Sequence, residues 1–246
     1  MKRRRRQGTE DAEGEAVRRV RGRLRMVATP IGNLEDLTYR AARTLSEADV
    51  IACEDTRVTS KLLSAYHITA KPIVSLHHHT PDAKIRNVIH SILAGQTVAY
   101  VTDAGTPGVN DPGGKLVEAA YAAGITTEPI PGPSALAAAI SVCGFPMERF
   151  TYIGFLPHKK GRETAMREIS ARHEPTVFFE STHRIHRAMD ELAHHLNPSR
   201  LIYVGRELTK KFETNLRGTV EEVRALMEGK STKGEFVVIV GPRRND

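Results

Sequence analysis

The segment TVAYVTDAGTPGVNDPG, at positions 97–113, holds the residues best suited to chemistry. Its first five residues form a β-rich apolar run, and the Gly, Pro and Asp residues that follow continue neither a strand nor a helix. Glycine lets the main chain approach a ligand closely, and Asp103 supplies a fixed hydrogen-bond acceptor. A usual connection needs only about 4–6 residues, so this long loop predicts a ligand site, with a purely structural connection as the alternative.

Two other predicted strands end in similar breaks. The strand 24–28 runs into TPIGNLEDL at 29–37, where we expect Asp36 to cap a helix over 37–47. A later strand runs into PGPSALAAAI at 131–140, where Ser134 is the expected helix cap. Neither break contains GxGxxG or GxxxxGK[ST], which excludes the usual dinucleotide loop and the P-loop. Helix N-termini behind such loops suit an anionic group.

Carboxylates beside basic residues form the candidate acid–base groups. Glu54, Asp55 and Arg57 follow a predicted strand over 49–53. They predict proton transfer or RNA contact, and the alternative is that Asp55 only caps a helix and pairs on the surface. Similar clusters occur in the second half, around Glu180 and Lys210. The candidate catalytic residues are therefore Asp55, Glu54, Arg57, Glu180 and Lys210, and we rank Asp55 first.

The run His77–His79 suggests a metal site at first sight, but the pattern argues against one. Adjacent side chains on a strand point to opposite faces, so three of them cannot converge on one ion. Cys53 and Cys143 have no metal-binding or redox spacing, and we expect both to be buried thiols in a reducing cytoplasm. We therefore expect an enzyme without a metal.

Strands and helices alternate along the chain, which predicts an α/β fold. The pattern restarts after residue 143, so we expect a basic tail over 1–23 and α/β domains over 24–143 and 144–246. No apolar run approaches the roughly 18 residues of a membrane span, and the N-terminus lacks the apolar region of a secretory signal. These features predict a cytoplasmic protein without a membrane partner.

The net charge of +7 comes almost entirely from the tail, because residues 1–25 carry ten Lys or Arg against four Asp or Glu. Low apolar content predicts disorder there. The tail either holds RNA phosphates, is a solvated extension without a role, or results from the choice of start codon. Basic residues also gather at loops and helix starts in the second half. They either bind a phosphate backbone or are ordinary solvent-exposed charges, and the sequence favours neither interpretation. The candidate RNA-binding residues are Lys159, Lys160, Arg162, His183, Arg184, Arg206 and Lys211.

Six stretches in order carry a resemblance to a known family: VATPIGNLEDLTYRA, CEDTR, VTDAGTPGVNDPG, PGPSALAAA, GFLPHKKGR and FESTHR. Together they resemble the small-subunit ribosomal RNA methyltransferase I family, a branch of the tetrapyrrole-methylase-like class III methyltransferases. The resemblance covers about residues 24–241. Each motif alone is weak, but six in order at matching intervals are specific.

The resemblance implies two α/β domains of the tetrapyrrole-methylase type, with S-adenosylmethionine in the cleft between them, and a homodimer. It implies methylation of the ribose 2′-oxygen of a cytidine at the decoding centre of 16S rRNA, in free rRNA or the small ribosomal subunit. The cofactor-binding positions that it implies are Pro30, Gly32, Asn33, Asp103, Ala104, Gly105, Thr106, Gly108, Val109, Pro131, Gly132, Ser134 and Ala135.

Two other functions remain open at this point. The first is C-methylation of a tetrapyrrole precursor, which the charged GRELTKK loop at 205–211 and the basic tail disfavour, since a tetrapyrrole pocket needs no long basic surface. The second is a non-catalytic RNA-binding factor in ribosome assembly, which would have no use for a methyl donor.

Overall fold

The computed structural model describes residues 22–243, and the predicted tail over 1–23 therefore lies almost wholly outside the described residues. The described chain forms two compact units. The first contains residues up to 27, 39–103 and 111–130, and the second contains 28–38, 104–110 and the chain from 131 onward. Helix α5 (Ala135–Cys143) thus lies in the second unit, whereas the boundary expected after residue 143 put it in the first.

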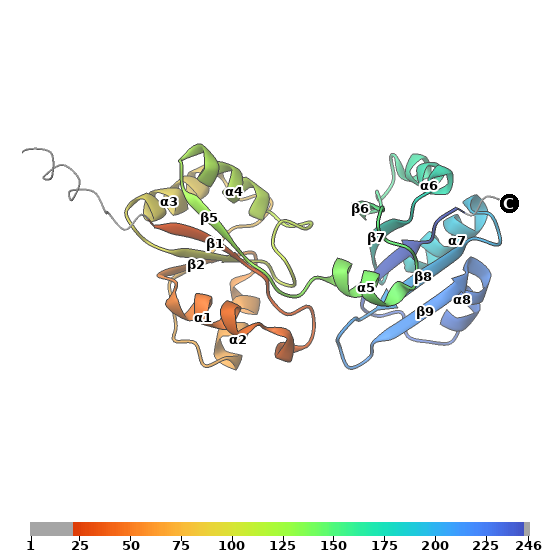
Figure 1. Ribbon diagram of the computed structural model, residues 1–246, viewed down its shortest axis with the longest axis horizontal. Coiled ribbons are helices and arrows are strands. Elements are labelled where there is room, and N and C mark those ends of the chain that lie inside the picture. The colour runs from red at the N-terminus through yellow and green to blue at the C-terminus, as the bar shows by residue number, and fades with distance from the viewer. Residues whose placement is uncertain (1–21, 244–246) are drawn as a thin grey trace, which may run out of the picture. The chain divides into compact units, whose positions relative to one another are not determined.

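The first unit is built on a parallel sheet with the strand order β3-β2-β4-β1-β5 (Figure 1). Helices α3 and α4 cover one face and α1 and α2 the other, so both faces are buried. Its elements are β1 (Arg23–Val27), α1 (Tyr39–Glu47), β2 (Val50–Cys53), α2 (Thr56–Ala65), β3 (Ile73–Ser75), α3 (Asp82–Leu93), β4 (Val98–Val101), α4 (Gly113–Ala122) and β5 (Thr126–Ile130).

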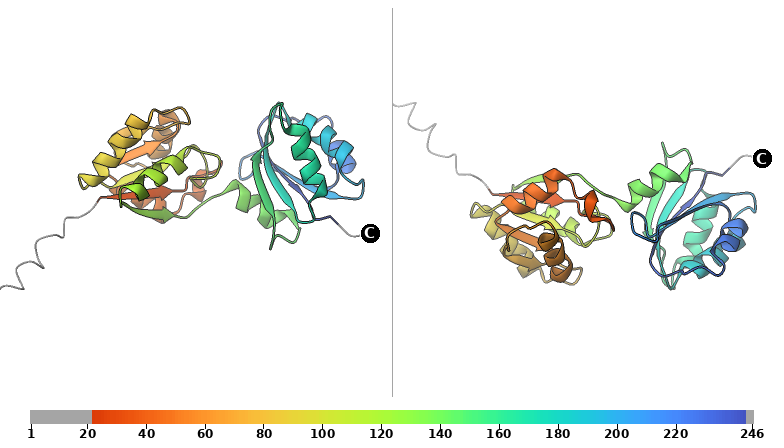
Figure 2. Two further views of the ribbon diagram at one scale, coloured as in Figure 1. Left: turned by 90° about the horizontal axis from the view of Figure 1, so that it is seen from above. Right: turned by 90° about the horizontal axis from the view of Figure 1, so that it is seen from below.

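The second unit is a mixed sheet with the order β6-β7-β10-β8-β9, in which only β6 and β7 pair in parallel. Helices lie on both of its faces (Figure 2). Its elements are α5 (Ala135–Cys143), β6 (Thr151–Phe155), α6 (Arg162–Ala171), β7 (Thr176–Ser181), α7 (Ile185–His195), β8 (Leu201–Arg206), β9 (Thr214–Thr219), α8 (Val220–Met227) and β10 (Glu235–Val240).

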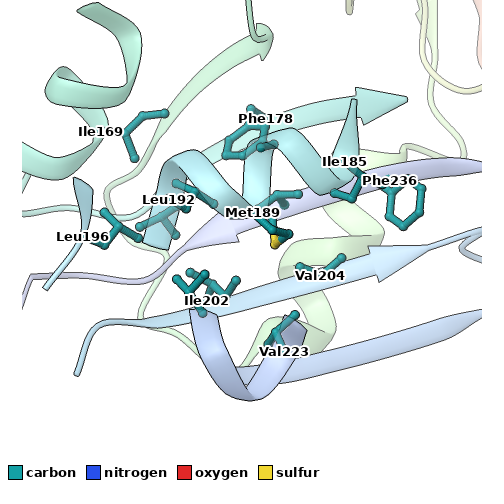
Figure 3. Close-up of a cluster of buried hydrophobic side chains, with 14 of the residues drawn as sticks. Ile169, Phe178, Ile185, Met189, Leu192, Leu196, Ile202, Val204, Val223 and Phe236 are labelled. Carbon is teal, nitrogen blue, oxygen red and sulfur yellow. The ribbon is translucent and has the colours of Figure 1, made fainter. Parts of the chain in front are cut away.

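Strand β10 explains why the second sheet needs helices on both sides. Successive side chains on a strand point to opposite faces. Phe236 and Val238 pack with α6, α7 and α8 in one cluster, whereas Val237 and Ile239 pack with α5 in another. Figure 3 shows the first cluster, where Met189 of α7 lies among strand residues. The continuous apolar run of this strand is the sequence signature of a centre buried on both faces.

The α/β prediction is confirmed, and the differences are local. Asp36 does not cap α1. Instead, Asn33 caps a short 3₁₀ helix, Leu34–Asp36, by accepting from the main-chain N–H of Glu35. His77–His79 lie in a turn after β3, where His77 N–H donates to Thr80 Oγ1 at 2.7 Å, so the argument from strand alternation does not apply to them.

The structure also corrects two site predictions in the second unit. Arg162 is only 2% exposed and donates to Glu191 Oε2 at 2.6 Å, so its side chain is not available to an RNA phosphate. Glu180 is 1% exposed and lies between two guanidinium groups, 2.7 Å from Arg184 Nε and 3.5 Å from Arg162 Nη1. A buried carboxylate held this way has a structural role, so Glu180 is a poor candidate for a general base.

We therefore predict that Glu180→Ala strongly destabilises the fold, because it leaves the buried guanidinium of Arg162 without this counter-charge. The expected loss in the free energy of unfolding is about 3–5 kcal/mol, measured by urea denaturation. The matched control is Glu163→Ala, which removes an exposed carboxylate that pairs with Arg167 and His195 and should destabilise the fold much less. Equal effects of the two variants would contradict the buried-pair account.

Candidate active site

Three predicted loops meet because β4, β1 and β5 are adjacent parallel strands, so their carboxyl ends share one edge of the sheet. Thr29 and Gly105 exchange two main-chain hydrogen bonds, each 3.0 Å long. Thr106 Oγ1 donates to the carbonyl of Pro133 at 2.9 Å. Segments 28–38, 104–110 and the turn after β5 are therefore joined to one another by direct contacts.

Glycine is required at two of these contacts. Gly105 has φ of +86°, and a Cβ there would lie 3.2 Å from Ile31 Cγ2. At Gly32, a Cβ would lie only 2.2 Å from Lys210 Cγ. A side chain at either position would crowd these contacts, and at Gly105 it would also have to adopt a strained backbone conformation.

The positions expected to bind the cofactor divide by exposure. Pro30 and Gly105 are buried, and Gly105 hydrogen-bonds to Thr29. The others reach the surface, either partly (Asn33, Thr106, Val109, Ser134 and Ala135) or more fully (Gly32, Asp103, Ala104, Gly108, Pro131 and Gly132). Ser134 caps α5 as predicted, with its side chain accepting from the N–H of Ala137.

A carboxylate cluster lies in the first unit, where β2 and β4 end side by side. Asp103 Oδ1 accepts from the main-chain N–H of Asp55 at 3.0 Å, and Thr102 Oγ1 donates to Glu54 Oε2 at 3.3 Å. Thr102 was not among the predicted site residues. Its position beside Asp103, at the end of an apolar strand, is the signal that could have found it.

Burial and mutual repulsion shift the acidity of this cluster. Burial and then the charge of Asp103 raise the pKa of Glu54. Partial burial also raises the pKa of Asp103, with the charge of Asp55 adding to the shift against the opposing main-chain hydrogen bond. A carboxyl with a raised pKa is a better proton acceptor near neutral pH than an unperturbed one.

Asp55 behaves differently from its neighbours. It caps α2 by accepting from the N–H of Arg57 at 2.8 Å, and Arg57 Nη2 donates to Oδ2 at 2.6 Å. These hydrogen bonds lower the pKa of Asp55 to about 2, which makes it a weak base. The capping alternative therefore fits this residue better than the catalytic one, and Glu54 becomes the stronger candidate.

The charged loop after β8 contacts segment 28–38 through Lys210, as the steric limit at Gly32 requires. Lys210 Nζ donates to Glu207 Oε1 at 2.8 Å and to Glu235 Oε2 at 2.9 Å. Burial lowers the pKa of Lys210, but these two hydrogen bonds outweigh it and raise the pKa overall. Lys210 is therefore a fixed cation and not a proton acceptor.

The candidate RNA-binding side chains differ in solvent exposure and in the hydrogen bonds that they already make. Lys159, Lys160, His183 and Lys211 are exposed. The guanidinium of Arg206 donates to the main-chain carbonyls of Phe212 and Lys233. Arg184 donates to Leu156 O at 2.9 Å and also pairs with Glu180.

Residues 22–243 contain no group of three or more His, Cys, Asp or Glu arranged to hold a metal ion. Over the same residues, none of the helices has the length and apolar character needed to cross a bilayer.

Comparison with known proteins gives a consistent result. Residues 23–224 match the family model of the tetrapyrrole (corrin/porphyrin) methylases. The chain is 45% identical over 221 residues to the ribosomal RNA small subunit methyltransferase I of Halalkalibacterium halodurans, covering 89% of this chain and 76% of that protein. It is 46% identical over 225 residues to the protein of the same name from Xylella fastidiosa, covering 89% and 81%.

A solved structure supports the fold. The cobalt precorrin-4 methyltransferase superposes with a TM-score of 0.68 at 17% identity, covering 92% of this chain and 98% of that one. At this identity the likeness concerns the fold alone. The resemblance found in the sequence motifs is confirmed by the relatives.

The opposite pKa shifts of Glu54 and Asp55 predict opposite effects of neutral substitutions. A raised pKa means that ionisation of Glu54 destabilises the fold, so Glu54→Gln should increase the free energy of unfolding at pH 7. This gain should vanish as the pH falls below the ordinary value of 4.5, where the carboxyl is already protonated.

Asp55→Asn is the matched control, because it keeps a capping side chain but removes a charge whose pKa is lowered. It should decrease the free energy of unfolding at pH 7, and this loss should shrink as the pH falls from 3.8 toward 2. Thermal unfolding at pH 7 and pH 4 measures Glu54→Gln, and Asp55→Asn is followed from pH 7 down to about pH 2. A loss of stability in Glu54→Gln that is equal at the two pH values would contradict the assignment.

Proposed function

We propose that this chain, which belongs to the tetrapyrrole methylase family and within it to the ribosomal RNA small subunit methyltransferase I group, methylates a ribose 2′-oxygen of a cytidine in 16S rRNA. The methyl donor is S-adenosylmethionine. The single observation that carries the proposal is the contact among three loops at adjacent strand ends, in a chain 45% identical to a named rRNA methyltransferase.

The exposed groups of the three loops suit the chemistry of the methyl donor. Asp103 is an exposed carboxylate that can accept from hydroxyl or amino groups. Exposed main chain at Ala104, Gly108 and Gly132 offers N–H donors and C=O acceptors to an amino acid group and an adenine. Bound S-adenosylmethionine supplies a methyl group already activated by its sulfonium, so the transfer itself needs no Lewis acid.

A ribose hydroxyl is a weak nucleophile at neutral pH, so the protein has to orient it and receive its proton. We assign the proton to Glu54, because its raised pKa brings it closer to neutral pH than Asp55, which is held at about 2. The hydrogen bond from Thr102 fixes one of its carboxylate oxygens. Arg57 is 85% exposed and anchored by Asp55, which suits a contact with a phosphate near the target nucleotide.

The remaining parts of the proposal follow the family resemblance. Lys159, Lys160 and Lys211 give exposed positive charge for the phosphate backbone. A homodimer, a cytoplasmic location and activity without a metal remain predictions. Tetrapyrrole methylation is the second candidate, and it is supported by the fold but not by the relatives' names.

The direct test is methyl transfer by the purified full chain from labelled S-adenosylmethionine to small ribosomal subunits that lack the modification. Nuclease digestion and mass spectrometry should then identify 2′-O-methylcytidine in 16S rRNA. A methyl group on a base, or incorporation only into a tetrapyrrole precursor, would overturn the proposal.

For the cofactor, we predict that Asp103→Asn weakens S-adenosylmethionine binding by about tenfold, as expected for one lost charge-assisted hydrogen bond of about 1.5 kcal/mol. Isothermal titration calorimetry measures the affinity. Asp82→Asn, which removes another exposed carboxylate at the start of α3, is the control and should bind normally. Unchanged affinity of Asp103→Asn would remove this residue from the site.

For proton transfer, we predict that Glu54→Gln lowers the single-turnover methylation rate by about 10²-fold or more while S-adenosylmethionine and RNA affinities stay normal. Asp55→Asn should lose much less rate. If instead Asp55→Asn abolishes the transfer at normal RNA affinity, Asp55 and not Glu54 receives the proton.

A further inference from the structure

One aromatic side chain in the second unit is unusually exposed for its type. Phe212 lies between β8 and β9 and is 66% exposed, although burying a Phe is normally favourable by about 1.5–3 kcal/mol. It lines a pocket of about 390 Å³ whose inner wall is apolar, formed by Val204, Leu216, Met227 and Phe236. An exposed ring at the mouth of such a pocket offers a flat apolar surface to a ligand.

Positive charge surrounds this ring. Lys211 Nζ lies 5.7 Å from the centre of the Phe212 ring, and Lys230 and Arg206 also line the pocket. Arg206 Nη1 donates to the carbonyl of Phe212 at 3.2 Å and its Nε donates to Lys233 O at 2.8 Å, so it fixes the backbone that carries the ring.

The acidic side chain in the pocket wall is directed to its own loop. Glu213 Oε2 accepts from the N–H of Thr209 at 2.6 Å, and Oε1 accepts from Asn215 Nδ2 at 2.7 Å. Its charge is therefore partly satisfied by hydrogen bonds within the protein. Three cationic side chains against one carboxylate leave the pocket with a positive balance, which favours a ligand that carries negative charge.

A single-stranded RNA segment meets both requirements. Its bases have flat apolar faces that stack on aromatic rings, and its phosphates attract lysine and arginine at the rim. A small inorganic anion would make no favourable contact with the apolar wall, and an apolar peptide would make none with the cations. A double helix is also a poor match, since its bases are already stacked and inaccessible.

We propose that this pocket is a base-stacking subsite, in which Phe212 stacks on one unpaired base of the RNA substrate and Lys211 and Lys230 contact the flanking phosphates. The proposal rests on the proposed function, because it names a second contact for the same RNA. It assigns Phe212 a role in RNA affinity that does not depend on sequence, since every base has a π-face.

The experiment uses the full chain and two eight-nucleotide RNAs, one of oligocytidylate and one with the same phosphates but abasic riboses. Phe212→Ala should weaken binding of the oligocytidylate by roughly fivefold or more and leave the abasic oligomer unchanged. Phe212→Tyr keeps an aromatic ring and should bind both RNAs with the affinity of the unchanged chain. Lys211→Ala should weaken both RNAs and make the salt dependence of binding less steep.

Two controls separate stacking from general surface effects. Tyr121→Ala removes an aromatic ring of similar exposure, 69%, from α4 in the first unit and should change neither RNA affinity. Lys115→Ala, on the same helix, is the control for loss of one exposed charge. Calorimetric binding of S-adenosylmethionine should be normal in all variants, which separates a failure of this subsite from a failure of the proposed function.

Three results would overturn the proposal. The first is an equal loss for the normal and abasic RNAs in Phe212→Ala, which would mean that the ring acts only through the loop. The second is unchanged affinity for both RNAs. The third is a changed oligomeric state with normal RNA binding, which would assign the ring to a contact between copies of this chain.

Discussion

The site depends on the pair of main-chain hydrogen bonds between Thr29 and Gly105. These bonds join the chain leaving β1 to the chain leaving β4, and Gly105 makes them with φ of +86°, a conformation that favours glycine. Adjacent parallel strands bring the two loops to one edge of the sheet, and this contact then fixes how they pass each other. The side chain of Thr106 extends the connection to Pro133, just after β5.

Two neighbouring carboxylates, Glu54 and Asp55, have pKa values shifted in opposite directions, which gives them different roles. Glu54 and Asp55 are adjacent in sequence, but only Asp55 lies where it can cap α2 and bind Arg57. The resulting low pKa of Asp55 stabilises the helix start and anchors Arg57. The Glu54 carboxylate accepts a hydrogen bond from Thr102, but burial and the nearby charge of Asp103 outweigh it and raise the pKa of Glu54. Separation of pKa values within such a pair is a common mark of a functional site.

Local sequence signals predicted most helices and strands, because an apolar run or a capping residue acts within the element that contains it. Strand β5, the apolar run of β10 and the cap at Ser134 were predicted at the positions where they occur. Two features were not predictable from local patterns. Asp36 and Asn33 are both good caps, and only the packed loop selects Asn33. The burial of Arg162 depends on Glu180 and Glu191, which lie 18 and 29 residues away along the chain.

The central claim is that segments 29–33, 103–109 and 131–135 together hold the methyl donor. Hydrogen exchange of the full chain, with and without S-adenosylmethionine, tests this claim most directly because it reports on main-chain N–H groups. We predict slower exchange on cofactor addition in all three segments, and no change in segment 212–232 when RNA is absent. Protection confined to a single segment, or found only outside the three, would contradict the account.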